Sequence, residues 1–299
     1  CETCRSRRID RRFVRKGLEY HGSQKMTPTT RTSKSAKRCL RMKRGLTGAI
    51  LTGLLIAHVN LVGTAIAHAE TALIAVAANF ADPAKRLAED FGAQTGHSLK
   101  ISTGSTGQLY AQITNGAPFD VFLSADAARP EKLEKVGLAV AGSRLTYALG
   151  RLVLWGAGTT PINERAEAIL SDPQFRSLAI ANPDLAPYGA AARETLQARG
   201  LWDSLKGRLV FGQNIGQTRA LVATGNAEIG FVALAQIKDS SATESYWLVP
   251  EKDHQPISQD AVLLTRARDN AAACAFMDYL KSPRARQIIA GFGYENGSG

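Results

Sequence analysis

Four short segments of the sequence could bind an anion without charged side chains. Each is small, polar and neutral, and each joins an apolar run to an amphipathic stretch: Ala77-Ala78-Asn79-Phe80, Gly104-Ser105-Thr106-Gly107, Ala186-Pro187-Tyr188-Gly189 and Gln213-Asn214-Ile215-Gly216-Gln217. A helix that begins at such a segment carries partial positive charge and backbone N–H groups without intrahelical partners. Several converging helix starts would therefore surround a tetrahedral anion with hydrogen-bond donors.

Side chains and glycines within these segments could strengthen such a site. We expect Asn79 and Thr106 to donate further hydrogen bonds, and the glycines at positions 104, 107, 189 and 216 to let the backbone approach a ligand closely. The alternative for each segment is ordinary helix capping, because Asn, Ser and Thr are preferred N-cap residues. A single segment would favour capping, whereas four in one chain favour an anion site.

Catalytic arrangements have less support in the sequence. His97 and His254, the two histidines from residue 70 onward, fall in a predicted turn and a polar loop, so neither a metal cluster nor a Ser-His-Asp arrangement is predicted. Ser124 and Asp126 could serve a secreted hydrolase, but a strand end followed by a helix N-cap explains them better. The segment that begins at Gly104 lacks the Gly-Lys-Ser/Thr ending of a nucleotide-binding loop. We therefore predict no enzyme activity and no cofactor.

Alternating β-rich and amphipathic runs predict the fold class. Strands are expected at 72–77, 100–102, 121–124, 145–155, 178–181, 209–211, 229–234, 246–249 and 261–265, and helices at 82–95, 109–113, 190–199, 218–224, 271–280 and 283–290. Strands that alternate with helices of this length are typical of parallel, doubly wound α/β sheets. Open α/β sheets bind ligands at the carboxyl ends of their strands, where the four neutral segments fall.

The net charge of +11 is concentrated at one end of the chain. Residues 1–69 hold 15 of the 37 Lys and Arg residues and 3 of the 26 Asp and Glu residues, so residues 70–299 hold 37 − 15 = 22 basic and 26 − 3 = 23 acidic side chains, a net charge of −1. The body of the protein is therefore not basic, and we predict no nucleic-acid partner.

Residues 26–69 have the three parts of a secretory signal peptide. Seven basic residues follow Met26, an apolar run covers 45–63, and Ala67-His68-Ala69 forms a small-x-small cleavage site. We expect cleavage after Ala69, a mature N-terminus at Glu70 and a periplasmic location. A membrane anchor is the alternative, but polar residues within the apolar run disfavour it. We interpret residues 1–25, which precede the signal, as upstream sequence that does not belong to the exported protein.

Across residues 72–294 the sequence resembles the periplasmic molybdate-binding proteins of ABC importers, the ModA family. The matching stretches are Ala-Ala-Asn-Phe at 77–80, Gly-Ser-Thr-Gly-Gln-Leu-Tyr-Ala-Gln-Ile at 104–113, Asn-Gly-Ala-Pro at 115–118, Asp-Val-Phe-Leu-Ser-Ala-Asp at 120–126, Asn182-Pro183 with Ala-Pro-Tyr-Gly at 186–189, and Gly-Phe-Val-Ala-Leu-Ala-Gln at 230–236. The resemblance implies a two-lobed α/β fold, that of the type II periplasmic binding proteins, with two crossover strands and the ligand in the interlobe cleft. By analogy, residues 70–147 and 257–299 form lobe one, and residues 148–256 form lobe two.

The resemblance also implies the ligand, its site and its partner. Members of the family hold molybdate or tungstate through neutral side chains and backbone amides, without direct coordination of the metal, at positions that match Ala78, Asn79, Thr106, Tyr188 and Ile215. The last two are expected to contribute backbone N–H groups. The implied protein is a monomer that delivers the oxyanion to the membrane permease of an ABC transporter. The alternative is the same architecture with another tetrahedral oxyanion, such as sulfate or phosphate.

Three positions depart from the family pattern. Thr106 stands where serine is usual, Ala78 lacks a hydroxyl that some members have, and Ala233 replaces a tyrosine that contacts the anion in another branch. We expect these changes to alter the affinity or the preference among oxyanions. Binding is expected to favour a closed arrangement of the lobes, because a ligand that contacts both lobes binds that state better.

Overall fold

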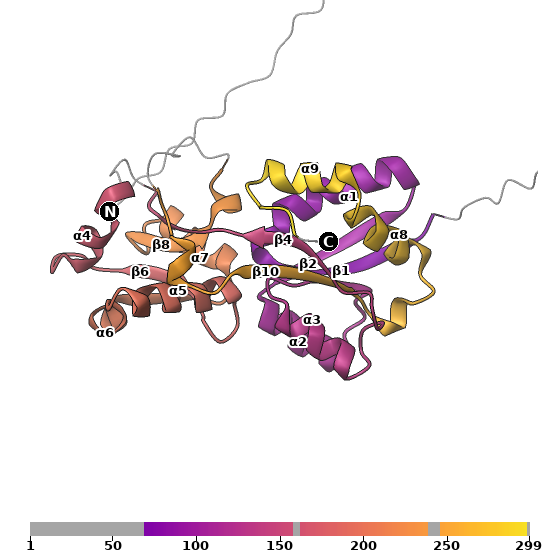
Figure 1. Cartoon of the computed structure of the whole chain (residues 1–299), viewed down its shortest axis with the longest axis horizontal. Helices are drawn as coiled ribbons and strands as arrows, with labels where there is room; N and C mark the ends of the chain where they lie inside the picture. Colours follow the sequence, from indigo (N-terminus) through magenta and orange to yellow (C-terminus); the bar gives the residue numbers. More distant parts are fainter. Residues whose placement is uncertain (1–68, 158–161, 239–245, 298–299) are drawn as a thin grey trace, which may run out of the picture. The chain divides into compact units, whose positions relative to one another are not determined.

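Alternating strands and helices make up the part of the chain that the structure, a computed structural model, describes: residues 69–157, 162–238 and 246–297 (Figure 1). The strands are β1 (Thr71–Ala77), β2 (Ser98–Gly104), β3 (Val121–Leu123), β4 (Leu145–Gly150), β5 (Leu152–Trp155), β6 (Leu178–Ala181), β7 (Leu209–Gly212), β8 (Ile229–Ala233), β9 (Tyr246–Leu248) and β10 (Ile257–Leu263). The α-helices are α1 (Ala81–Thr95), α2 (Thr106–Thr114), α3 (Ala128–Lys135), α4 (Ala166–Ser171), α5 (Pro187–Ala198), α6 (Trp202–Leu205), α7 (Ile215–Ala223), α8 (Ala271–Leu280) and α9 (Pro283–Gly291).

These strands form two five-stranded sheets. The first sheet has the order β2-β1-β3-β10-β4, and the second has the order β7-β6-β8-β5-β9. We call the first sheet with its helices lobe one and the second sheet with its helices lobe two. The predicted two-lobed α/β class is confirmed, whereas the lobe limits at 147/148 and 256/257 stay predictions.

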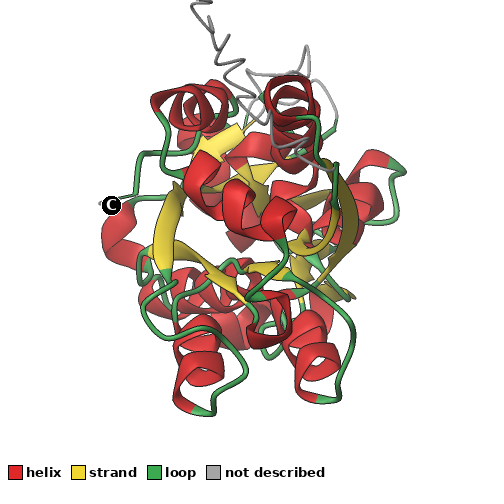
Figure 2. Cartoon of the chain, turned by 90° about the vertical axis from the view of Figure 1, so that its right-hand side faces the viewer, coloured by secondary structure: helices red, strands yellow, loops and turns green. Residues whose placement is uncertain are grey.

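Helices cover both faces of each sheet because side chains alternate along the strands (Figure 2). On β1, Ile74 and Val76 belong to the apolar cluster under α1 and α8, whereas Ala75 between them belongs to the cluster under α2 and α3. On β5, Leu154 packs with α5 residues and Val153 packs with α7 residues. The inner strands of each sheet are therefore covered on both faces, and the strand ends remain open for polar groups.

The segment 145–155, predicted as one strand, is two strands that lie in different sheets. Between Gly150 and Leu152 the chain leaves the first sheet and enters the second, and it returns through β10. Strand β5 runs antiparallel to β8, and β10 runs antiparallel to β3 and β4. The predicted parallel pairing is therefore found between β1 and β2, β1 and β3, β6 and β7, and β6 and β8, whereas β5 and β10 run antiparallel to their neighbours. Because β5 and β10 each enter a lobe from its neighbour, they run against the strands that end at the boundary between the lobes.

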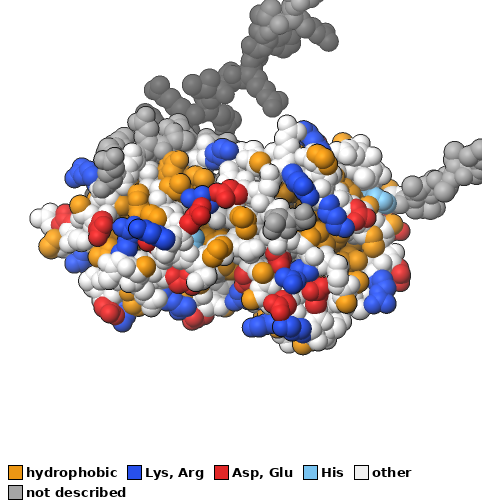
Figure 3. All heavy atoms as spheres, in the orientation of Figure 1, with side chains coloured by type: hydrophobic (Ala, Val, Ile, Leu, Met, Phe, Trp, Pro, Cys, Tyr) orange, Lys and Arg blue, Asp and Glu red, His pale blue; other side chains and the backbone are white. Residues whose placement is uncertain are grey.

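The charged side chains of lobes one and two are mixed, as the balanced composition of residues 70–299 requires. Lys, Arg, Asp and Glu are interspersed over the face shown in Figure 3. None of the helices in the described residues is both long enough and apolar enough to cross a membrane. The predicted upstream segment and signal peptide lie outside the described residues, apart from Ala69.

Gly189 is required where the first turn of α5 lies against β6. A Cβ added at Gly189 would lie 2.1 Å from the carbonyl oxygen of Ala181, so the helix would have to move. We predict that Gly189→Ala lowers the free energy of unfolding by about 1–3 kcal/mol. Gly291→Ala is the matched control, because Gly291 ends α9 and a Cβ there would meet nothing within 4 Å. Urea unfolding measures both variants, and equal free energies would contradict the prediction.

Candidate functional site

The carboxyl ends of strands from both lobes converge on one small cavity. It lies at the ends of β1, β2 and β3 in lobe one and before the starts of α5 and α7 in lobe two. The lining residues are all uncharged: Ala77, Ala78, Asn79, Gly104, Ser105, Thr106, Ala125, Ala186, Pro187, Tyr188, Asn214 and Ile215. The cavity volume is only about 10 Å³. Its walls are therefore close to one another, and a ligand would contact both lobes.

All five residues predicted from the sequence line this cavity. Ala78 and Asn79 begin a 3₁₀ turn, η1 (Ala78–Phe80), that leads into α1. Thr106 is the first residue of α2, Tyr188 is the second residue of α5, and Ile215 is the first residue of α7. The structure therefore places the four neutral segments around one point. Ala125, which follows β3, also lines the cavity and was not predicted.

Capping accounts for some of the polar groups in these segments but not for all of them. Ser105 Oγ accepts a hydrogen bond from the Gln108 backbone N–H at 3.3 Å, and Asn214 Oδ1 accepts one from the Gln217 N–H at 3.0 Å. Both acceptors satisfy the third N–H of their helices. The N–H groups of the first helical residues lie nearer the cavity and have no acceptor within their own helix. Capping and anion binding can therefore operate at the same helix start.

The glycines of the four segments serve the packing of the chain itself. A Cβ added at Gly107 would lie 3.0 Å from the Leu185 carbonyl oxygen, and one at Gly216 would lie 3.1 Å from Asn214 Oδ1 and 3.8 Å from the Ala78 Cβ. These glycines therefore lie in close contact with protein atoms, and their approach to a ligand stays a prediction. At Gly107 and Gly216 these atoms include groups of the opposite lobe.

Thr106 is held with its hydroxyl in a defined orientation. Its side chain is buried, and Oγ1 accepts a hydrogen bond from the Ala125 N–H at 3.1 Å. A hydroxyl has one hydrogen and two lone pairs, so the hydrogen of Thr106 is left to donate elsewhere. Thr106 lines the cavity, so its hydroxyl hydrogen can be donated there.

The Asn79 side chain is engaged by residues that the sequence analysis missed. Its Nδ2 donates to Gln259 Oε1 at 2.7 Å and to Tyr294 Oη at 3.0 Å, and Tyr294 Oη donates to the Asn79 carbonyl at 2.9 Å. An amide nitrogen has two hydrogens, so both are used. The expected side-chain donation to a ligand is therefore not available in this arrangement, and the backbone N–H of Asn79 is the donor that remains.

Three buried phenols surround Gln259. Burial is the main cause that raises the pKa of Tyr147, Tyr188 and Tyr294 well above that of a free phenol, so all three are protonated at neutral pH. Tyr147 Oη donates to the Ser124 carbonyl at 3.0 Å. The Tyr188 hydroxyl and Gln259 Nε2 are buried close to each other beside Gly150, and among the described residues neither makes a hydrogen bond of good geometry. The layer behind the cavity is thus as uncharged as its lining.

Ser124 and Asp126, considered above for a hydrolase, hold lobe one together. Ser124 Oγ donates to Asp126 Oδ1 at 3.2 Å, and the same oxygen accepts from the Arg129 N–H at 2.9 Å. The other carboxylate oxygen forms an ion pair with the Arg129 guanidinium. Both oxygens of this carboxylate are therefore engaged by Arg129 at the start of α3, and no histidine in the described part of the chain is among their hydrogen-bond partners. Among the residues that the structure describes, no group of three metal-ligating side chains occurs.

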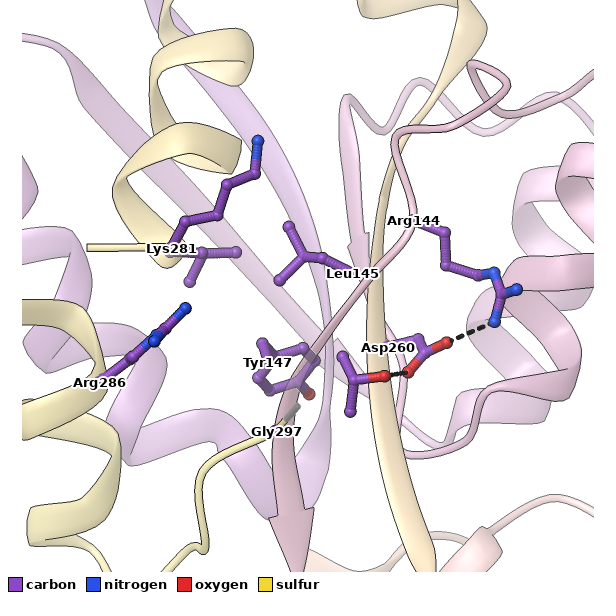
Figure 4. Close-up of a pocket in the computed structure, with 9 residues that line it drawn as sticks. Arg144, Leu145, Tyr147, Asp260, Lys281, Arg286 and Gly297 are labelled. Carbon is purple, nitrogen blue, oxygen red and sulfur yellow. Dashed lines mark hydrogen bonds and ion pairs between the residues drawn. The ribbon is translucent and has the colours of Figure 1, made fainter. Parts of the chain in front are cut away.

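A larger pocket of about 440 Å³ lies in lobe one, away from the five predicted residues (Figure 4). Its charged residues include Lys281 and Arg286 on one side and the Arg144–Asp260 pair on the other. Asp260 is buried, and its carboxylate accepts from Arg144 Nη1 at 2.9 Å and from Thr146 Oγ1 at 2.7 Å. The Asp260 carboxylate is therefore paired within lobe one, whereas Lys281 and Arg286 are exposed.

A family model for bacterial extracellular solute-binding proteins matches residues 72–295. With its two lobes and its cavity between strand ends, the chain belongs to this family of extracellular solute-binding proteins. The relatives that carry the name molybdate-binding protein ModA include one from each of two bacteria. One, from Azotobacter vinelandii, is 52% identical over 230 residues, which are 76% of this chain and 91% of that protein. The other, from Rhodobacter capsulatus, is 46% identical over 228 residues, which are 76% of this chain and 89% of that protein.

A solved structure supports the same family assignment. The Azotobacter vinelandii periplasmic molybdate-binding protein superimposes with a TM-score of 0.72 at 42% identity, and the match covers 75% of this chain and 98% of that one. The predicted resemblance to the ModA family is confirmed.

The buried phenols predict how stability changes at alkaline pH. Below the free phenol pKa of about 10, the folded and unfolded states both keep these protons, so the contribution of the phenols is constant. Above it, the unfolded chain loses protons that the folded chain keeps, so stability falls as pH rises. We expect urea titrations from about pH 9 to 11 to show this fall and Tyr147→Phe to make it smaller. An identical fall in that variant would contradict the explanation.

Proposed function

We propose that the protein is an exported monomer that captures molybdate, or the similar tungstate, and delivers it to the permease of an ABC transporter. The observation that supports this most is the uncharged cavity lined by helix starts from both lobes. A tetrahedral oxyanion spreads its charge over four oxygens and suits several converging neutral donors. The ModA names of the relatives favour molybdate over other oxyanions.

The proposed donors differ in kind. Tyr188, Ile215 and Asn79 would donate through their backbone N–H groups, and Thr106 would donate through its hydroxyl. Pro187 is the first residue of α5 and has no N–H, so the Tyr188 N–H is the first backbone donor of that helix. These N–H and O–H groups would bind the oxyanion as dipoles that the fold already holds in position before the oxyanion enters.

Ala78 would act through its small size. Its Cβ lies 3.8 Å from the position of a Cβ added at Gly216, so η1 of lobe one and the start of α7 in lobe two are already close. A larger residue at this position would fill the space between the lobes. Ala233, the third departure from the family pattern, is fully buried in β8 and does not line the cavity. We propose that it makes no ligand contact.

Calorimetric titration tests the ligand and its contacts together. We predict that residues 70–299 bind molybdate and tungstate, that Thr106→Val weakens molybdate binding by about tenfold or more, and that Thr106→Ser keeps most of it, because one hydrogen bond to an anion is lost only in the valine variant. Ala78→Leu is expected to abolish binding by occupying the cavity. Thermal unfolding without ligand separates a binding defect from a folding defect.

Two other outcomes of these experiments would contradict the proposed function. Binding of sulfate or phosphate without molybdate or tungstate would reject the proposed ligand and keep the architecture. Substrate turnover that Ser124→Ala abolishes would instead support the hydrolase hypothesis.

We propose that the chain is exported and cleaved between Ala69 and Glu70. In support, Glu70 already belongs to lobe one: its N–H donates to His97 Nδ1 at 3.1 Å, and its carboxylate accepts from the Ala271 N–H at 2.7 Å. Strand β1 begins at the next residue.

Expression from Met26 in a bacterium, followed by N-terminal sequencing of the periplasmic fraction, tests the cleavage. We predict Glu70 as the first residue. Ala69→Asp is expected to leave the precursor uncleaved, because signal peptidase requires a small residue there, whereas His68→Ser should be processed normally. An uncleaved wild-type chain in the membrane fraction would favour the anchor alternative.

A further inference from the structure

Two hydrogen bonds cross from lobe one to lobe two beside the cavity. The Gly107 N–H donates to the Leu185 carbonyl at 2.8 Å, and Arg129 Nη2 donates to the Asp184 carbonyl at 3.1 Å. The two acceptors are consecutive carbonyls in the turn between β6 and α5. Lobe one therefore binds one short piece of lobe two at two adjacent points.

The accepting turn is held by hydrogen bonds of its own. Asn182 Oδ1 accepts from the Asp184 N–H at 3.0 Å, and the Asn182 carbonyl accepts from the N–H groups of Leu185 and Ala186 at 3.1 and 2.9 Å. These bonds fix where the carbonyls of Asp184 and Leu185 point. Because the turn leads directly into α5, its position fixes the start of that helix.

Arg129 joins the two lobes through its planar guanidinium. Nη1 forms the ion pair with Asp126 in lobe one, while Nη2 reaches Asp184 in lobe two. The side chain is partly buried and lines an opening of about 280 Å³ together with Pro183 and Pro187 of lobe two. A guanidinium can serve both partners at fixed angles, which a single lysine ammonium cannot reproduce.

Gly107 allows the two lobes to approach at this point. A Cβ at position 107 would lie 3.0 Å from the Leu185 oxygen and 3.1 Å from the Leu185 Cα. Gly107 directly follows Thr106, and Leu185 stands three residues before Tyr188. The hydrogen bond between Gly107 and Leu185 therefore links the two helix starts that carry these cavity residues.

We propose that Gly107 and Arg129 are positioning residues that set oxyanion selectivity. We call their two bonds to the 184–185 carbonyls the interlobe latch. Neither residue lines the cavity, but the latch fixes the separation between Thr106 and Tyr188 and hence the cavity size. In a cavity of fixed size, a smaller tetrahedral anion leaves some donors unmatched, which lowers its affinity relative to the anion that fits. The inference rests on the proposed function.

Calorimetry with molybdate and sulfate on the mature chain tests the latch. We expect Arg129→Ala to weaken molybdate binding about three- to tenfold and to affect sulfate less, so the ratio of the two affinities falls. Arg129→Lys should recover only part of the ratio, and Gly107→Ala should lower it as well. Arg193→Ala is the matched control, because Arg193 Nη1 lies 3.6 Å from Asp184 Oδ1 but belongs to lobe two itself.

The outcomes separate the two proposals. If the wild-type chain binds molybdate and all latch variants keep its affinity ratio, the latch is wrong and the proposed function stands. Equal losses for both anions would also overturn the latch, because a general defect of folding has that effect. If the wild-type chain binds neither molybdate nor tungstate, the proposed function fails and the selectivity inference fails with it. Thermal unfolding without ligand verifies that each variant is folded.

Discussion

The first turn of an α-helix leaves N–H groups that no carbonyl of the same helix can accept, and three helices of this protein begin at one cavity. Helix α2 shows how these groups are divided. Thr106 faces the cavity, the Gly107 N–H binds the opposite lobe, and the Gln108 N–H is capped by Ser105. The sheets, the crossover and the close approach of the lobes all serve to bring such helix starts together.

Neutrality extends from the cavity lining to the groups behind it. The three phenols around Gln259 are kept protonated by burial, and the neighbouring carboxylate of Asp126 is paired with Arg129. An anion that enters would therefore meet fixed dipoles in a region of low polarity, where each hydrogen bond is stronger than in water. A charged lining would bind many anions, whereas fixed dipoles bind most tightly the anion whose oxygens match their positions.

The sequence located most strands and helices because apolar residues recur along them at the spacing of a strand or a helix. It missed α3, α4 and α6, which are short or strongly polar. It also began β10 too late, because Gln259 and Asp260 look like loop residues. Both are fully buried, since β10 lies between β3 and β4. Gln259 Oε1 and the Asp260 carboxylate accept hydrogen bonds from residues distant in sequence. No local pattern contains that information.

By itself the sequence determined the α/β class, the family and the four neutral segments, because helix starts, strand ends and hydrophobic alternation are local properties of the chain. Only the tertiary structure decided how these segments are used. It directed the Asn79 side chain to Gln259 and Tyr294, divided the run 145–155 between two sheets, and placed Gly107 against Leu185. These outcomes depend on the approach of residues far apart in the chain, and that approach is fixed by the packing of two lobes rather than by any single segment.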